Sequence, residues 1–243
     1  MARLDSLAML AALDGLLLVD KPSNISTHDV VKAVKSRFNL VKVGHGGTLE
    51  PNATGLVVLL VGDGTKFSND LMGRDRAYTA TFRLGRVTDT QDREGRTLEE
   101  RPFDAVTRER LDAVLPEFRG DIFQTPPPFS VIKRPDTPTY GIVPTDPAER
   151  TTRLVHVYRL AVTAFAPPLV TVEFVCTKGV SARALAHDLG QSLGCGASLE
   201  SLRRTRVAKF DVADAIGLLD LLKLDAVGFR DTIREISIAK AVT

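Results

Sequence analysis

The amino-acid sequence predicts an α+β fold, with a single domain in which helices flank a mixed, mainly antiparallel central sheet. Two observations indicate this class. Apolar runs of strand length recur along the chain, and single helices with a helical apolar period lie among the strands without strict βαβα alternation. Of the 243 residues, 44% are apolar and 26% are charged, which is typical of a globular domain with a sizeable core.

The first residues and the cysteines suggest the limits of the domain and its compartment. We expect residues 1–14 to form a helix or tail and residues 15–243 to form the domain. No apolar run approaches the ~20 residues of a membrane-spanning helix, so no membrane partner is expected. Cys176 and Cys195 lack metal-ligand spacing and offer at most one disulfide, which favours a cytoplasmic protein without a metal.

The first third of the chain contains clear strand and helix signals. Residues 15–19 are apolar and predict a buried strand. Ser26-Thr27-His28-Asp29 has the spacing of a capping box, which predicts that a helix starts there. We then expect a short strand near residues 41–43, a strand at 56–61, and a turn at 62–64 that leads into a short helix.

The remainder alternates between strands and single helices. Residues 77–84 alternate in polarity, so Tyr78, Ala80, Phe82 and Leu84 are predicted to share one face of a strand. The other predicted elements are a polar turn at 88–95, a helix at 107–118, a surface loop at 134–152, strands at 154–165 and 170–177, a helix from Ser181 to Leu193 that ends at Gly194, a basic strand at 202–210, and helices at 216–224 and 226–236.

The most unusual stretch lies at residues 43–55 and is called the glycine loop below. It holds four glycines, His45, Glu50 and Pro51 within thirteen residues, and it reads Val-Gly-His-Gly-Gly-Thr-Leu-Glu-Pro-Asn-Ala-Thr-Gly. Such a composition favours a tight loop that brings main chain and a few polar side chains close to a ligand. The buried strand that follows would support the loop rigidly, and function concentrates on loops of this kind.

The glycine loop closely resembles the active-site motif of the bacterial TruB family of tRNA pseudouridine synthases. Other blocks of that family are matched in the same order and spacing from about Gly15 to Leu218. They are Asp20-Lys21-Pro22, Arg76-Ala77-Tyr78, Leu84 to Asp92, Pro126 to Lys133, Cys176-Thr177-Lys178-Gly179 with Arg183, Asp188-Leu189-Gly190, Leu193 to Ala197, and Leu202-Arg203-Arg204.

The resemblance implies an RNA isomerase. Such enzymes convert a uridine in the T-loop of tRNA (the position 55 type) to its C-glycoside, without a cofactor, by detaching, rotating and rejoining the base. The target nucleotide must leave its stack to be reached, which is base flipping. The expected partner is the T-arm of tRNA. We expect a monomer.

Three residues are implied in catalysis. Glu50 occupies the position of the family's aspartate and would act as nucleophile or base at the ribose. Arg183 matches an arginine that would hold this carboxylate ionised and oriented. Tyr78 matches an aromatic residue that would stack on the flipped base.

Seven further residues are implied in substrate or RNA binding, and no metal ligand is implied. His45 would contact the substrate, Leu202 would line the uracil pocket, and Ser181 stands where the family has a tyrosine. The predicted phosphate contacts are Lys21, Lys133, Arg203 and Arg204.

Each of these residue types also has a structural interpretation. Tyr78 could be a core tyrosine on its alternating strand, His45 could satisfy a main-chain carbonyl, and Arg183 could decorate its helix. Asp89 is predicted to brace a turn through its own main chain rather than to act in catalysis.

The match is not complete, and the departures define an alternative function. Glu50 replaces aspartate, Ser181 replaces tyrosine and Asn24 replaces glycine. The extra methylene of Glu50 moves the carboxylate by about 1 Å, and such a misplacement can cost ~100-fold in rate. The chain also ends about 25 residues after Leu218, so no separate C-terminal RNA-binding domain is expected. The alternative is a weak or inactive homologue that binds or remodels tRNA.

Overall fold

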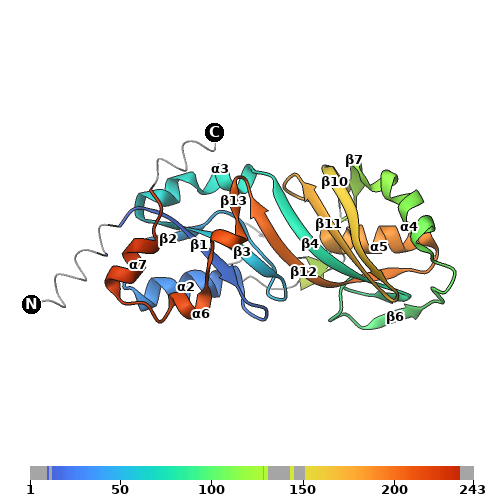
Figure 1. The fold of residues 1–243 in the computed structure, drawn as a ribbon, viewed down its shortest axis with the longest axis horizontal. Coiled ribbons are helices and arrows are strands. Elements are labelled where there is room, and N and C mark those ends of the chain that lie inside the picture. Colours follow the sequence, from blue (N-terminus) through green and yellow to red (C-terminus); the bar gives the residue numbers. More distant parts are fainter. Residues whose placement is uncertain (1–9, 11–12, 128, 131–142, 145–150, 236–243) are drawn as a thin grey trace, which may run out of the picture. The chain divides into compact units, whose positions relative to one another are not determined.

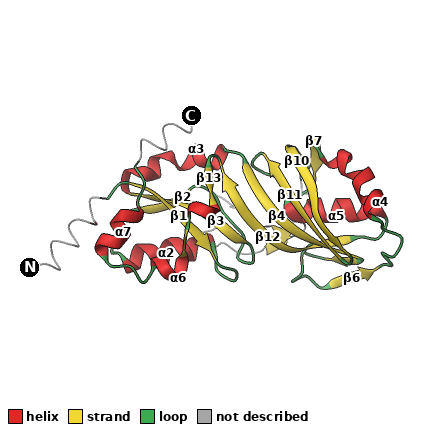
Figure 2. Cartoon of the chain, viewed as in Figure 1, coloured by secondary structure: helices red, strands yellow, loops and turns green. Residues whose placement is uncertain are grey.

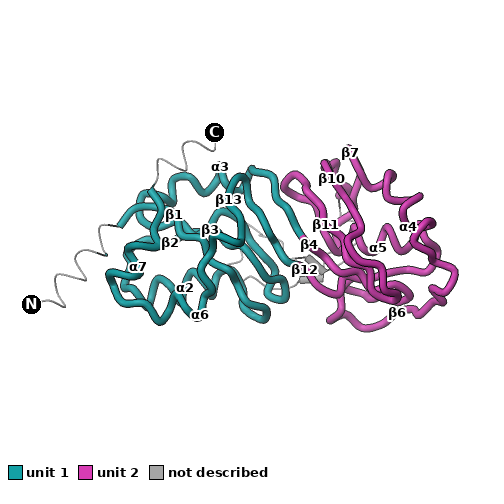
Figure 3. The backbone as a smooth tube through the Cα atoms, in the orientation of Figure 1, with its two compact units in different colours: residues 1–78, 203–243 teal, residues 79–202 magenta. Residues whose placement is uncertain are grey.

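The computed structural model describes residues 10, 13–127, 129–130, 143–144 and 151–235. The chain divides into two compact units, one of residues 1–78 and 203–243 and the other of residues 79–202 (Figure 3). The sequence had predicted one domain over this range. Two strands, β4 (Arg76–Leu84) and β12 (Ala197–Val207), contribute residues to both units, so the chain changes unit within each of them.

The first unit contains a mixed sheet. Its strands follow the order β14 (Ile216–Gly217), β1 (Gly15–Lys21), β3 (Thr54–Val61) and β12, with β2 (Val43–His45) also paired to β3 and β13 (Phe210–Asp211) to β12. β1 and β2 run antiparallel to β3, whereas β12 runs parallel to it. This arrangement confirms the predicted mixed sheet.

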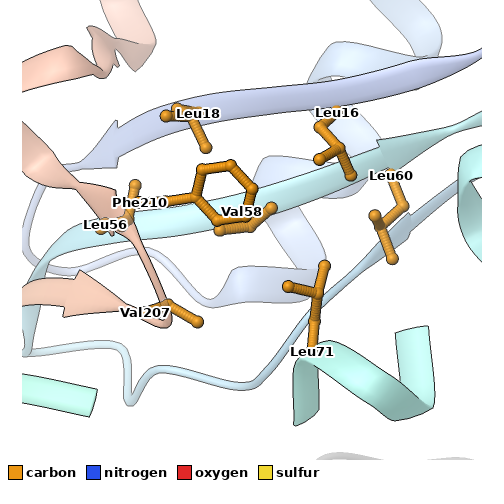
Figure 4. Packing of buried hydrophobic residues seen from close by; sticks show 8 residues of the cluster. All are labelled: Leu16, Leu18, Leu56, Val58, Leu60, Leu71, Val207 and Phe210. Atoms are coloured by element: carbon orange, nitrogen blue, oxygen red, sulfur yellow. The ribbon is translucent and has the colours of Figure 1, made fainter. Parts of the chain in front are cut away.

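The core of the first unit lies on one face of β1 and β3. Alternate residues of the two strands point towards α3 (Ser68–Gly73) and pack with residues from β12 and β13 (Figure 4). The cluster consists of Leu16, Leu18, Leu56, Val58, Leu60, Leu71, Val207 and Phe210. The intervening residues of both strands are buried as well, because helices cover both faces of the sheet (Figure 1).

Helix α2 (Thr27–Arg37) covers the other face and begins as the sequence predicts. Ser26 accepts a hydrogen bond from the Asp29 main-chain N–H, and the Asp29 carboxylate accepts one from the Ser26 N–H, which completes the capping box. Phe38 then stacks on Phe229 with ring centroids 3.8 Å apart. The other helices of this unit are η1 (Gly62–Phe67), η4 (Val212–Asp214), α6 (Leu218–Leu221) and α7 (Ala226–Thr232).

The second unit is an antiparallel sheet with helices packed beside it (Figure 2). Its strands follow the order β4, β11 (Leu169–Cys176), β10 (Arg153–Ala166) and β7 (Gly120–Gln124). Short pairs are formed by β5 (Arg86–Thr88) with β6 (Thr97–Glu100) and by β8 (Phe129–Ser130) with β9 (Val143–Pro144). On β4, Ala80, Phe82 and Leu84 are buried on one face, as the alternating pattern predicts.

The helices of the second unit also follow their sequence signals. α4 (Arg108–Val114) begins at a Thr107 cap and continues into η2 (Leu115–Phe118), which together cover the predicted helix. α5 (Ala182–Leu193) begins at a Ser181 cap and ends at Gly194, whose φ of +81° is the left-handed conformation that favours glycine.

Some predictions differ from the structure or lie outside the described residues. The strand expected near 41–43 lies at Val43–His45, because its partner residues on β3 are Leu59 to Val61. Most of the N-terminal segment 1–14 and of the loop 134–152 lies outside the described residues. Among the described residues, no helix combines the length and the apolar character needed to cross a membrane.

Gly190 provides a test of the packing in the second unit. A Cβ at this position would lie 2.1 Å from the Ala197 main-chain nitrogen and 2.4 Å from the Gly196 carbonyl carbon. We expect Gly190→Ala to lower the free energy of unfolding by ~1–3 kcal/mol, measured by urea denaturation. Gly73→Ala is the matched control, because a Cβ there meets nothing within 4 Å. Equal stability of the two variants would contradict this packing.

Candidate active site

The glycine loop connects two paired strands of the first unit. It leaves β2 at His45 and enters β3 at Thr54, and the two strands pair antiparallel with His45 opposite Leu59. The Gly46 N–H donates to the Val58 carbonyl at 2.9 Å, which extends the pairing into the loop. The strand that follows the loop is part of the sheet, as the sequence predicts, and the strand before the loop is attached to the same sheet.

Residues from the end of β1 to the start of α2 hold the middle of the loop. The Lys21 ammonium donates to the Pro51 carbonyl at 2.9 Å and also to the carbonyls of Pro22 and Ile25. Ser23 Oγ donates to the Asn52 carbonyl at 3.0 Å. The Thr27 hydroxyl is buried, donates to the Leu49 carbonyl at 3.0 Å and accepts from the Leu49 N–H at 2.9 Å. The main chain on each side of Glu50 is thus fixed by hydrogen bonds.

Arg204 on β12 joins the first half of the loop to the strand that follows the loop. Its Nη2 donates to the Gly47 carbonyl at 3.2 Å, its Nη1 to the Thr48 carbonyl at 3.0 Å, and its Nε to the Leu56 carbonyl at 2.7 Å. Tyr78 lies beside this side chain, where it opposes the lowering of the Arg204 pKa by burial. One planar group therefore joins the start of the loop, the strand that follows it and the tyrosine predicted to stack on the base.

Gly55 allows the main chain of β12 at Arg204 to lie close to β3. In the sheet register, Gly55 on β3 stands opposite Lys21 on β1 and opposite Arg204 on β12. Its φ is +105°, and a Cβ would lie 2.2 Å from the Arg204 carbonyl oxygen, so only glycine fits between the two strands.

The burial of the two cations corrects one prediction. Lys21 is 0% and Arg204 1% exposed, and their donors are directed to main-chain carbonyls. Neither can therefore serve as the predicted phosphate contact. Burial, and then the nearby Arg204 charge, lower the pKa of Lys21 to about 8. Burial is also the main cause that lowers the pKa of Arg204.

Arg203 is not buried as Arg204 is, because successive side chains on a strand point to opposite faces of the sheet. Its guanidinium makes two hydrogen bonds with the Asp20 carboxylate, at 3.0 Å and 2.7 Å. The side chain is 41% exposed, so a charged ligand can still reach it. Arg203 remains a predicted phosphate contact.

Glu50, His45 and Tyr78 lie in this same unit and are half-buried. Glu50 begins a tight turn, in which the Ala53 N–H donates to the Glu50 carbonyl at 3.1 Å. His45 Nδ1 accepts from the Gly47 N–H at 3.2 Å, which orients the ring within the loop. The first unit therefore brings together the predicted carboxylate loop, its histidine and Tyr78, although their catalytic roles stay predictions.

Arg183, Ser181 and Leu202 lie in the second unit. Arg183 is buried in the first turn of α5, where its Nη1 donates to the Thr90 carbonyl at 3.1 Å and lies 3.8 Å from the Asp92 carboxylate. Ser181 caps the same helix, since its Oγ accepts from the Ala184 N–H at 3.2 Å. Leu202 is half-buried on β12. Lys133 lies outside the described residues.

The turn at residues 88–95 supports Arg183. The sequence predicts the role of Asp89 in this turn but not that of Asp92. Asp89 braces this turn as predicted, because its carboxylate accepts from the Arg96 N–H at 2.9 Å. Asp92 was not singled out. Its carboxylate accepts from the Thr90 hydroxyl at 2.6 Å and from the Glu94 N–H at 3.0 Å.

The contact of Thr27 with the glycine loop was also not predicted, because a threonine at the start of a helix is too common to indicate a loop contact.

Family models match most of the chain. A model described as "TruB family pseudouridylate synthase (N terminal domain)" matches residues 35–181, and a model described as "tRNA pseudouridylate synthase B C-terminal domain" matches residues 183–236. The sequence prediction had drawn no boundary between these segments. Among the described residues, no group of three or more His, Cys, Asp or Glu side chains could hold a metal ion.

Individual proteins are similar over most of the chain. A protein of Opitutus terrae named tRNA pseudouridine synthase B is 44% identical over 207 residues, which cover 85% of this chain and 86% of that protein. A protein of the same name from Pseudomonas aeruginosa is 41% identical over 218 residues, which cover 89% and 71%.

Two solved structures resemble the fold. One is described as a Cbf5-Nop10-Gar1 complex, with a TM-score of 0.75 and 27% identity over 96% of this chain and 63% of the solved chain. The other is an H/ACA RNP bound to a substrate RNA containing 2′-deoxyuridine, with a TM-score of 0.67 and 26% identity over 91% and 56%. This chain thus spans less than two thirds of either solved chain.

The pKa of Lys21 predicts a pH dependence of stability. Because this pKa is about 8 in the fold instead of 10.5, the unfolded chain binds more protons between these pH values, and the free energy of unfolding should rise with pH there. We expect the difference between wild type and Lys21→Met, measured by urea denaturation, to change in favour of wild type from pH 8 to 10.5. A difference that does not vary with pH would contradict the assignment.

Proposed function

Because this chain belongs to the TruB family of pseudouridylate synthases, we propose that it isomerises a uridine of tRNA to pseudouridine. The reaction breaks the bond between N1 of uracil and C1′ of the ribose and forms a bond between C5 and C1′. A proton leaves C5 and N1 gains one, so the atoms balance without a cofactor. The protein must hold the sugar, the detached base and a carboxylate in fixed relative positions while the base rotates.

The observation that carries the proposal is the support of Glu50. Hydrogen bonds from Thr27, Lys21 and Arg204 fix the main chain around this residue, while its side chain is only half-buried. A carboxylate on a loop whose main chain is held in this way suits a group that acts at the sugar of a bound nucleotide. Glu50 is therefore proposed as the catalytic carboxylate.

The proposed RNA target is the T-arm of tRNA, from which the uridine is flipped out. Tyr78 is proposed to stack on the flipped base, and His45 and Leu202 to contact the nucleotide. Arg203 is proposed as a phosphate contact on the strength of its exposed position on β12. We also propose that the protein acts as a monomer in the cytoplasm.

Arg183 is proposed as a second catalytic residue from the family motif. Within the second unit its guanidinium is already oriented by the Thr90 carbonyl and the Asp92 carboxylate. Ser181, at the position of a family tyrosine, is proposed to act near the RNA while it caps α5. These two roles rest on sequence resemblance and on local geometry.

Turnover on a T-arm hairpin RNA tests the proposal. Wild-type protein should form pseudouridine, detected by mass spectrometry, and Glu50→Gln should lower the rate at least ~100-fold, as loss of a positioned acid–base group does. Glu50→Asp restores the family's residue and is expected to raise turnover. Glu117→Gln, at an exposed position of η2, is the matched control and should leave the rate unchanged.

Two outcomes would contradict the proposed function. If wild-type protein binds the hairpin but forms no pseudouridine, the chain binds or remodels RNA without catalysis. If Glu50→Gln is as active as wild type, the carboxylate at the sugar is another residue.

A further inference from the structure

Arg204 was expected to contact phosphate, but its surroundings indicate a different task. We propose that Arg204 is a positioning residue for the isomerisation, and that its guanidinium sets the segment carrying Glu50 and the hydroxyl of Tyr78 in one fixed arrangement. The inference rests on the proposed function, because that reaction requires the carboxylate and the aromatic ring to act on the same nucleotide.

The first support is the set of carbonyls that Arg204 binds. Gly47 and Thr48 precede Glu50 by three and two residues, and Leu56 follows it by six. All three guanidinium nitrogens are used, with donor–acceptor distances from 2.7 Å to 3.2 Å. Since the guanidinium is planar and rigid, the distance between the two sides of the loop is fixed by one group.

The second support is the interaction of Arg204 with Tyr78. The same side chain interacts with this tyrosine, which lies on β4 and is the last residue of that strand within the first unit. A shift of the guanidinium would therefore move the loop and release the tyrosine hydroxyl together. A residue that touched only the loop or only Tyr78 could not couple them in this way.

The third support is that the main chain of Arg204 is itself held in the sheet. The main chain of Arg204 pairs with Gly55, and the missing side chain of Gly55 lets the two strands approach closely. Arg204 is thus anchored to the end of the loop by its main chain and to the start of the loop by its guanidinium. At 1% exposure it cannot reach an RNA phosphate, in contrast to the 41% exposed side chain of Arg203.

Arg204→Lys is the variant that tests the inference. Lysine keeps the positive charge but has a compact ammonium that cannot span the same carbonyls and Tyr78 at once. We expect kcat on the T-arm hairpin to fall ~100-fold, the size of a misplacement of about 1 Å, while the Kd for the hairpin stays within about threefold of wild type. Arg119→Lys is the matched control, because Arg119 also binds a main-chain carbonyl, that of Leu160, but outside this site.

A mutant cycle tests the link to Tyr78. We expect Arg204→Lys and Tyr78→Phe to lower kcat together by less than the product of their separate effects, because both remove the same interaction. Multiplicative effects would overturn the coupling. A rise in Kd with unchanged kcat, and a weaker dependence of Kd on salt, would overturn the inference in favour of a phosphate contact.

These experiments distinguish a failure of the proposed function from a failure of the role proposed for Arg204. If wild type is inactive on the hairpin, the proposed function fails; if wild type is active and Arg204→Lys keeps its kcat, only the role of Arg204 fails. Should Arg204→Lys not fold, NMR of wild type labelled with ¹⁵N-arginine decides. Separate, slowly exchanging Nη signals from Arg204 are expected, and averaged, rapidly exchanging signals would overturn the inference.

Discussion

Two buried cations that donate hydrogen bonds to main-chain carbonyls hold the glycine loop, and the arrangement of the candidate site depends on them. A loop with this many glycines has a high conformational entropy when free, so its fixed shape requires bonds to its main chain. Lys21 and Arg204 supply these bonds from β1 and β12, the strands on either side of β3. The loop is thus held by its neighbours in the sheet rather than by its own composition.

This arrangement has an electrostatic cost that the fold offsets locally. Burying a cation is unfavourable unless its donors are satisfied, and two cations close together repel each other. The depressed pKa of Lys21 reflects both effects. Carbonyl oxygens of the glycine loop, together with those of Pro22, Ile25 and Leu56, are the acceptors that offset the cost, so the loop and the cations stabilise each other. Gly55 permits the arrangement because it leaves room between the two strands.

Much of the fold could be predicted from local signals, but the support of the site could not. The capping box at Ser26, the alternation along β4 and the end of α5 at Gly194 depend on neighbouring residues, and each was predicted correctly. The burial of Lys21 and Arg204 depends on strand register between distant segments. A basic residue in a motif for RNA binding therefore looked like a phosphate contact, and only the pairing with Gly55 reveals that it faces inward.

Amide hydrogen exchange at Leu49, next to Glu50, tests most directly whether the loop is held as described. Its N–H donates to the buried Thr27 hydroxyl at 2.9 Å, within the segment that Lys21 and Arg204 enclose. The account predicts that the Leu49 amide exchanges as slowly as amides in the centre of β3, since both would open only when the sheet opens. Exchange at the rate of an unstructured peptide would show that the loop is not held, and would contradict the account.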